Sequence, residues 1–339
     1  MSRQFLPERP NLDQLRRQAK ELLRVATAGD PSAIARVRDG SQRMTLAAAQ
    51  LALAREYGYA SWPRLKAEVE RKTALVNGDA DRLAELLTSY PELAADGVSS
   101  CFTPDPADSP LSFLAVAGFH GLVNHQRAGE LTRVMLAAGA DVDGGHDAET
   151  PLIAAASYYE SDMVRALIEA GANLEATGTE VPGGTALTHA VWFGRPDIVD
   201  VLVQAGAVIH NLREAAGAGD IAGFLTPRPT MADREIAMIT AAGCARLSVV
   251  DELLATGVDV NAAPGWHFGA GVTALHRAAW LGHADSVRHL LLRGADPERH
   301  DDEHQGTPLD WCRRRNNEWF PGQRIGSAVE EVLTGQPPS

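Results

Sequence analysis

The chain has 339 residues, enough for about two domains, and its 45% hydrophobic and 22% charged residues exclude wholesale disorder. The formal net charge of −13 disfavours binding to nucleic acid or to an anionic membrane surface, and favours a partner that carries a basic patch. No apolar run approaches the ~20 residues needed to cross a bilayer, and the first residues lack the apolar core of a signal peptide, so we expect a cytoplasmic protein.

Residues 1–72 carry a helical pattern that does not repeat. Apolar residues recur at helical spacing from Leu12 to Ala26, and a Gly-Asp-Pro sequence then breaks the pattern. A second apolar stripe runs from Leu46 to Tyr57, and Ser61 is placed to cap a third helix over 64–72. We expect a small helical module that covers the exposed apolar end of the domain that follows.

Short signatures recur in the rest of the chain. Thr150 and Thr185 open two copies 35 residues apart, and Thr273 and Thr307 open two more that are 34 residues apart. A threonine before Pro or Ala is a good helix N-cap, and each second, leucine-rich segment ends at a glycine suited to a left-handed C-cap. Each unit can bury its apolar face only against its neighbours, so the pattern predicts a stacked helical solenoid.

These residues resemble the ankyrin repeat, whose period is about 33 residues with a TPLHxA signature. The stretch 271–296, with GVTALHRAAWLGH and RGAD, matches most closely, and the resemblance extends from about residue 75 to 333. It implies an all-α ankyrin-repeat solenoid of helix-turn-helix units with hairpin loops. We expect a helical capping module at 1–72, a repeat domain at 73–335 and a tail at 336–339. A leader with the sequence YGYASWP followed by ankyrin copies is similar to a group of bacterial ankyrin-repeat proteins.

Two segments depart from the repeat. The copy opened by Ser109 carries extra residues at about 120–128 before its second helix. The segment 207–235 lacks the TPLH signature and is expected to form a shortened helix pair with a loop.

Motifs for known chemistry are missing from the sequence. It contains no GxxxxGK[ST], GxSxG, HExxH or CxxC, so we expect no cofactor, no metal and no enzymatic activity. The resemblance gives His276 and His283 structural roles at repeat junctions. The run HDDEH at 300–304 is expected to be a solvated hairpin, with metal binding as the alternative. The recurrent acids Asp141, Asp143, Asp259 and Asp296 are expected to cap turns.

Aromatic and basic residues occupy variable positions of the first helices. In ankyrin-repeat proteins these positions line the concave surface, and Trp and Arg are enriched at binding hot spots. The alternative is that Trp192 and Trp280 only pack against adjacent repeats. The candidate partner-binding residues are Tyr158, His189, Trp192, Phe193, Trp266, Arg277, Trp280, Trp311 and Arg314.

The sequence therefore predicts a non-enzymatic module that binds a protein partner through its concave face. A toxin-neutralising or regulatory role within an operon would also be binding of this kind. The alternative from another class is a small-molecule or enzymatic site in the groove, built from its His, Trp and Arg residues.

Overall fold

The computed structural model describes residues 6, 7, 9–40, 43–98, 109–122, 125–145, 149–158, 160–179, 181, 183–265, 269–318 and 327–335. Every regular element in these residues is a helix. The chain divides into two compact units, Met1–Asn173 and Leu174–Ser339, called unit 1 and unit 2 below. No helix in the described ranges combines the length and apolar character that crossing a bilayer requires.

The elements of unit 1 are α1 (Leu12–Thr27), α2 (Pro31–Gly40), α3 (Leu46–Glu56), α4 (Trp62–Asn77), α5 (Ala80–Ser89), η1 (Pro91–Ala94), α6 (Pro110–Phe119), η2 (His125–Arg127), α7 (Ala128–Ala137), α8 (Pro151–Ser157) and α9 (Ser161–Glu169). The elements of unit 2 are α10 (Ala186–Trp192), α11 (Pro196–Gln204), α12 (Leu212–Ala218), η3 (Ala222–Phe224), α13 (Met231–Gly243), α14 (Leu247–Ala255), α15 (Ala274–Leu281), α16 (Ala284–Leu292), α17 (Pro308–Glu318) and α18 (Ser327–Thr334).

The N-terminal helices follow the apolar pattern of the sequence, with one helix more than expected. The stripe of α1 is buried, and Ser61 accepts a hydrogen bond from the Arg64 N–H at the start of α4, as expected. Pro31 begins α2 instead of only breaking α1, because Asp30 caps the new helix by accepting a hydrogen bond from the Ala33 N–H at 2.7 Å. Helix α4 also continues past Lys72 to Asn77, and its C-cap is Gly78, which has φ 69°.

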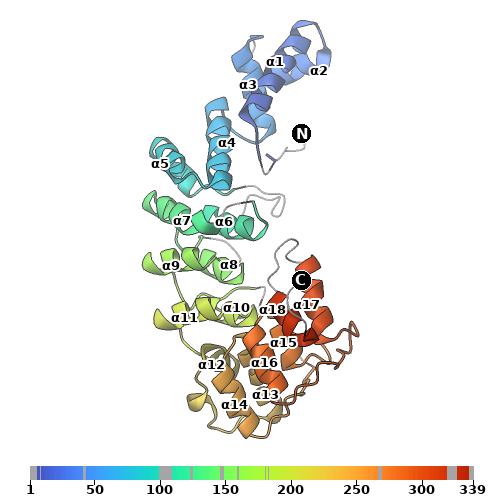
Figure 1. The fold of residues 1–339 in the computed structure, drawn as a ribbon. Coiled ribbons are helices and arrows are strands. Elements are labelled where there is room, and N and C mark those ends of the chain that lie inside the picture. Colours follow the sequence, from blue (N-terminus) through green and yellow to red (C-terminus); the bar gives the residue numbers. More distant parts are fainter. Residues whose placement is uncertain are drawn as a thin grey trace. The chain divides into compact units, whose positions relative to one another are not determined.

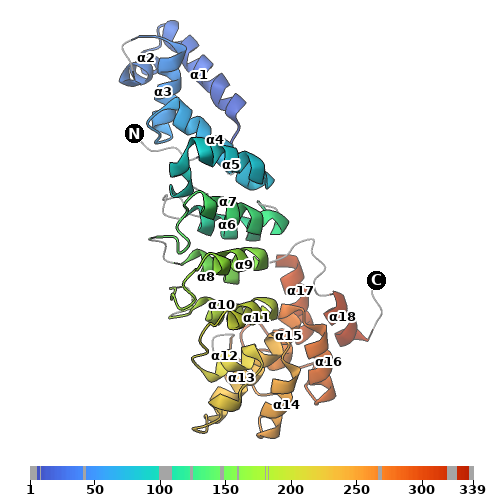
Figure 2. The same ribbon diagram turned by 90° about the vertical axis from the view of Figure 1, so that its left-hand side faces the viewer.

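Helix pairs follow in the second half of unit 1. The pair α6–α7 stacks on the pair α8–α9, as both views show (Figure 1 and Figure 2). Ser109 and Thr150 cap α6 and α8, each with a proline directly after it. The extra residues expected at about 120–128 separate α6 from α7 and include the short helix η2.

In unit 2 the first helices of successive repeats pack on one another in the order α10, α12, α13, α15 and α17 (Figure 1). Thr185 and Thr273 cap α10 and α15 with capping boxes, which confirms the expected helix starts. The helix pair at 207–235 is shortened, as expected. Helix α12 is followed only by the 3₁₀ turn η3, and α13 then opens the next pair.

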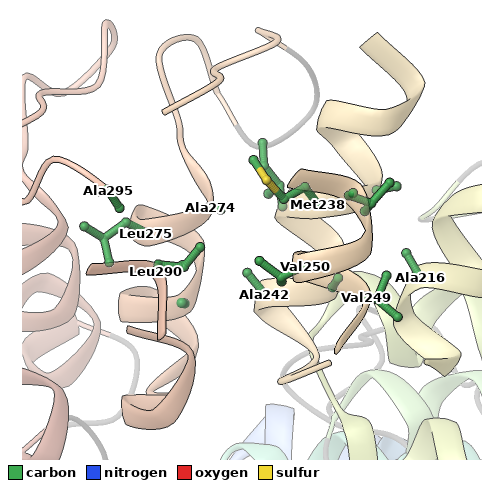
Figure 3. Close-up of a cluster of buried hydrophobic side chains, with 14 of the residues drawn as sticks. Ala216, Met238, Ala242, Val249, Val250, Ala274, Leu275, Leu290 and Ala295 are labelled. Carbon is green, nitrogen blue, oxygen red and sulfur yellow. The ribbon is translucent and has the colours of Figure 1, made fainter. Parts of the chain in front are cut away.

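The core of unit 2 is built from small and branched side chains of these helices. Figure 3 shows part of it, with Met238 and Val250 from α13 and α14 on one side and Leu275 and Leu290 from α15 and α16 on the other. All four side chains are at most 1% exposed. Truncating one such residue to alanine costs about 2–5 kcal/mol.

Glycines let the C-terminal ends of the first helices approach closely in unit 2. A Cβ atom on Gly217 of α12 would lie 2.6 Å from Val191 of α10. A Cβ on Gly194, just after α10, would lie 2.6 Å from the carbonyl oxygen of Gly243 in α13 and would overlap Leu281 of α15. The ends of α10, α13 and α15 therefore meet directly, and only residues without a side chain fit between them.

Candidate functional site

Three variable positions on each first helix carry the candidate residues of unit 2. The first position holds His189, Arg277 and Trp311, the second holds Trp192, Trp280 and Arg314, and the third holds Phe193, Leu281 and Arg315. The second position is the most open of the three, because Trp192 and Trp280 are partly buried and Arg314 is exposed.

Two candidates are wrong as surface residues. His189 is 0% exposed, and Arg277 is 9% exposed. The Arg277 guanidinium donates a hydrogen bond to the carbonyl oxygen of Trp192, 85 residues away in the sequence. Arg277 lies among the converging ends of the first helices, and His189 lies against Gly184, which precedes α10. Both side chains are buried, so they offer little surface to a macromolecular partner.

The carbonyl groups at the end of α10 accept further contacts from distant side chains. The Cys244 Sγ–H donates to the Val191 oxygen at 3.6 Å, and His283 Nε2 lies 3.4 Å from the Gly194 oxygen. Burial raises the pKa of Cys244 to about 12. Burial also lowers the pKa of His283, and the nearby cations Arg315 and Arg277 add to that effect. The contacts at His283 give it a structural role.

Trp192 and Phe193 lie at the end of α10 and pack against neighbouring groups. The guanidinium of Arg213 lies over the Trp192 ring, 5.7 Å from its centroid. Burial lowers the pKa of Arg213, against the opposing charge of Glu214. The Phe193 ring lies 6.3 Å from that of His189.

Trp280 and Trp311 form an aromatic pair between α15 and α17. Their ring centroids are 5.7 Å apart with an interplanar angle of 74°, an edge-to-face arrangement. Trp311 also contacts the rings of His276 at 5.6 Å and His304 at 6.4 Å. Both indoles are partly buried, so each keeps some surface for a ligand.

The Asp301 carboxylate fixes the orientation of the Trp311 indole. Its carboxylate accepts hydrogen bonds from Trp311 Nε1 at 2.9 Å and from the N–H groups of Glu303, His304 and Gly306 at 3.0, 2.6 and 2.8 Å. Burial opposes its ionisation, but these donors hold the pKa of Asp301 at about 2. The expectation that residues 300–304 form a wholly solvated hairpin was therefore wrong for Asp301, which is 1% exposed.

His276 and the periodic acids hold repeats together. His276 is 0% exposed, with Nδ1 2.9 Å from the Thr273 hydroxyl and Nε2 3.1 Å from the Gly306 oxygen, which confirms its structural role. Burial lowers the pKa of His276.

Asp141, Asp259 and Asp296 each accept a hydrogen bond from the N–H two residues ahead, as turn caps do. Asp143 differs from them, because it accepts a hydrogen bond from the Asn173 N–H of the following turn.

The remaining candidates are Tyr158 and Trp266. Tyr158 belongs to unit 1, where its ring lies 5.1 Å from that of Phe119. Trp266 lies outside the described residues.

Two surface cavities occur in unit 1, of about 580 Å³ against α1, α2 and α3 and about 390 Å³ against α1, α4 and α5, and no candidate residue lines either one. In the described ranges, no group of three or more His, Cys, Asp or Glu side chains is placed to hold a metal ion.

Three residues of the site were not among the sequence candidates: Arg213, Asp301 and His304. Arg213 lies on α12, in the segment without the repeat signature. It could therefore not be aligned with the variable positions of the other repeats. Asp301 and His304 were expected to lie in a solvated hairpin, with metal binding as the alternative. Asp301 lies five residues before the GTPL sequence, and Trp311 lies two residues after its leucine. This spacing could have suggested the hydrogen bond between the two side chains.

A family model described as ankyrin repeats in three copies matches residues 119–214 and 212–301, more than half of the chain. The matched residues include α7 to α16, in agreement with the all-helical repeat fold. This chain belongs to the ankyrin-repeat family.

Proposed function

We propose that this protein is a non-enzymatic, cytoplasmic interaction module that binds a protein partner through Trp280, Trp311 and Arg314 of unit 2. These three residues are called the Trp280–Trp311 surface below. Ankyrin repeats generally mediate protein–protein interaction, which supports the class of function.

The observation that carries the proposal is the tryptophan pair itself. Two partly buried indoles lie edge to face on adjacent first helices, and a guanidinium is exposed on the same helix as Trp311. Asp301 holds the Trp311 indole in one orientation through Nε1. A rigid aromatic surface loses little side-chain entropy on binding, and Trp and Arg are the side chains most enriched at hot spots.

The concave groove contributes less to this proposal than the sequence predicted. His189 and Arg277 are buried, and His276 and His283 contact backbone carbonyls within the repeats. The same contacts weaken the alternative of a small-molecule or enzymatic site built from these histidines and Arg277. Tyr158, Trp192, Phe193 and Trp266 stay predictions, and the proposal does not depend on them.

The experiment is site-specific photo-crosslinking in cells of the source organism. A crosslinking amino acid replaces Arg314, or Leu292 as the control, an 80% exposed side chain on the second helix of the preceding pair. We expect a protein that is captured at position 314 and not at position 292.

Affinity for the purified partner then decides the role of Trp280. Replacing Trp280 by Ala should weaken binding by about thirtyfold, as for a hot spot worth about 2 kcal/mol, and Leu292→Ala should leave it unchanged. Equal capture at both positions, or affinity that survives Trp280→Ala, would remove the proposed surface.

A further inference from the structure

Two carboxylates without partners belong to the hairpin whose residues Asp301 and His304 contact Trp311. Asp302 and Glu303 are exposed, and within the described residues neither carboxylate makes a hydrogen bond or an ion pair. Several other acids of unit 2 are paired. Asp251 binds Arg293 at 2.9 Å, and Glu330 binds Arg313 at 2.7 Å. Glu252 and Glu298 are also exposed and have no partner among the described residues, so what distinguishes Asp302 and Glu303 is their position between Asp301 and His304, which contact Trp311.

The backbone that carries these two acids is fixed. The Asp301 carboxylate binds the N–H groups of Glu303 and His304, and the Asp302 N–H donates to the Ala270 oxygen of the preceding hairpin at 2.9 Å. Gly271 permits this contact, because a Cβ there would lie 2.5 Å from the Asp302 nitrogen. The backbone that carries both carboxylates is thus preorganised, and a ligand that binds them need not order the loop.

The same hairpin joins the acids to the aromatic pair. Asp301, directly before Asp302, binds Trp311 Nε1 at 2.9 Å. His304, directly after Glu303, has its ring 6.4 Å from that of Trp311. Anionic oxygens and indole faces both attract a guanidinium or ammonium group, the first by charge and the second through the ring quadrupole.

We propose that Asp302 and Glu303 extend the Trp280–Trp311 surface into a docking site for a partner segment with basic side chains next to an apolar one. This inference rests on the proposed function and specifies its partner. An arginine of the segment pairs with the two carboxylates, and the apolar side chain covers the indoles. The net charge of −13 steers such a segment toward the protein.

Local cations limit the choice of segment. Arg299 and Arg314 are exposed on either side of the hairpin in the sequence. They disfavour a uniformly positive chain, because like charges would then face one another. The site fits isolated basic residues, each flanked by apolar ones.

Fluorescence anisotropy with short labelled peptides tests this specificity. The probe peptide has two arginines flanking a leucine, and its matched peptide has glutamates in place of the arginines. The wild-type chain should bind the arginine peptide and not the glutamate peptide. Asp302→Asn combined with Glu303→Gln should weaken binding at least tenfold, and Trp280→Ala should weaken it as well.

The control variant combines Asp81→Asn with Glu252→Gln, which removes the same charge from exposed acids on α5 and α14. It should bind the arginine peptide like the wild type. Equal weakening by both double variants would show attraction to the overall charge and overturn the inference, as would no binding of the arginine peptide by the wild type.

The crosslinked partner separates this inference from the proposed function. A partner whose affinity depends on Trp280 but not on Asp302 and Glu303 leaves the proposed function standing and overturns the basic docking site. A partner whose affinity depends on neither overturns both.

Discussion

Gly194→Ala is expected to destabilise unit 2 far more than an ordinary substitution of a left-handed glycine. Gly194 has φ +66°, which costs an alanine about 1–2 kcal/mol. The added Cβ would also lie 2.6 Å from the Gly243 carbonyl oxygen and overlap the Leu281 side chain. Backbone in a packed helix cannot move away cheaply, and such overpacking costs about 1–3 kcal/mol more. The expected loss of unfolding free energy is therefore about 2–5 kcal/mol.

The matched control is Gly206→Ala. Gly206 has φ +97°, and no atom lies within 4 Å of the place that its added Cβ would take, so only the backbone cost of about 1–2 kcal/mol remains. Urea unfolding followed by tryptophan fluorescence measures the stability of both variants. The signal reports mainly on unit 2, because Trp62 is the only tryptophan in unit 1. If Gly194→Ala is no more destabilising than Gly206→Ala, the helix ends do not meet as described.

Three further predictions concern buried titratable groups. Asp301→Asn should lower the stability of unit 2 by about 2 kcal/mol at pH 6, because a neutral amide is a weaker acceptor for four donors. The depressed pKa of about 2 means that this stabilisation is present above about pH 4 and is lost as the pH falls toward 2, so the difference between variant and wild type should shrink over that range in thermal unfolding scans. In a Cys101→Ser background, Cys244 and Cys312 should react with a thiol reagent no faster than the protein opens, because burial raises their pKa values to about 12 and about 11; rapid reaction of the folded chain would contradict their burial. His276 and His283 should titrate below the ordinary value near 6.5 by NMR, and because the unfolded chain then binds protons first, stability should fall as the pH drops below about 6.5; normal titration of both would refute their burial.

Local signals in the sequence predicted the helices of the repeats well. Thr150, Thr185 and Thr273 cap the helices that they were expected to open. Helix α2 was not predicted, because proline was interpreted as a break although it also suits the first position of a helix. Capping is decided by neighbours within a few residues, so it can be found without the fold.

The candidate site was predicted less completely, because it depends on contacts between distant residues. Arg277 was expected on an open face and is instead bonded to the end of α10, where Gly194 and Gly243 let the helices meet. A repeat frame assigns a position to each residue but not the curvature of the stack. Asp301 lies in a run of polar residues that suggested exposure to solvent. Its buried position depends on hydrogen bonds from Trp311 and from the backbone N–H groups of residues 303, 304 and 306, which the sequence pattern did not reveal.

Hydrogen exchange of the full chain, with and without the partner captured at position 314, tests the central claim most directly. Binding at the Trp280–Trp311 surface predicts slower exchange in α15, in α17 and in the hairpin 300–306, with no change in α14 and α16. Protection confined to α14 and α16, or to the helices of unit 1, would contradict the proposed function.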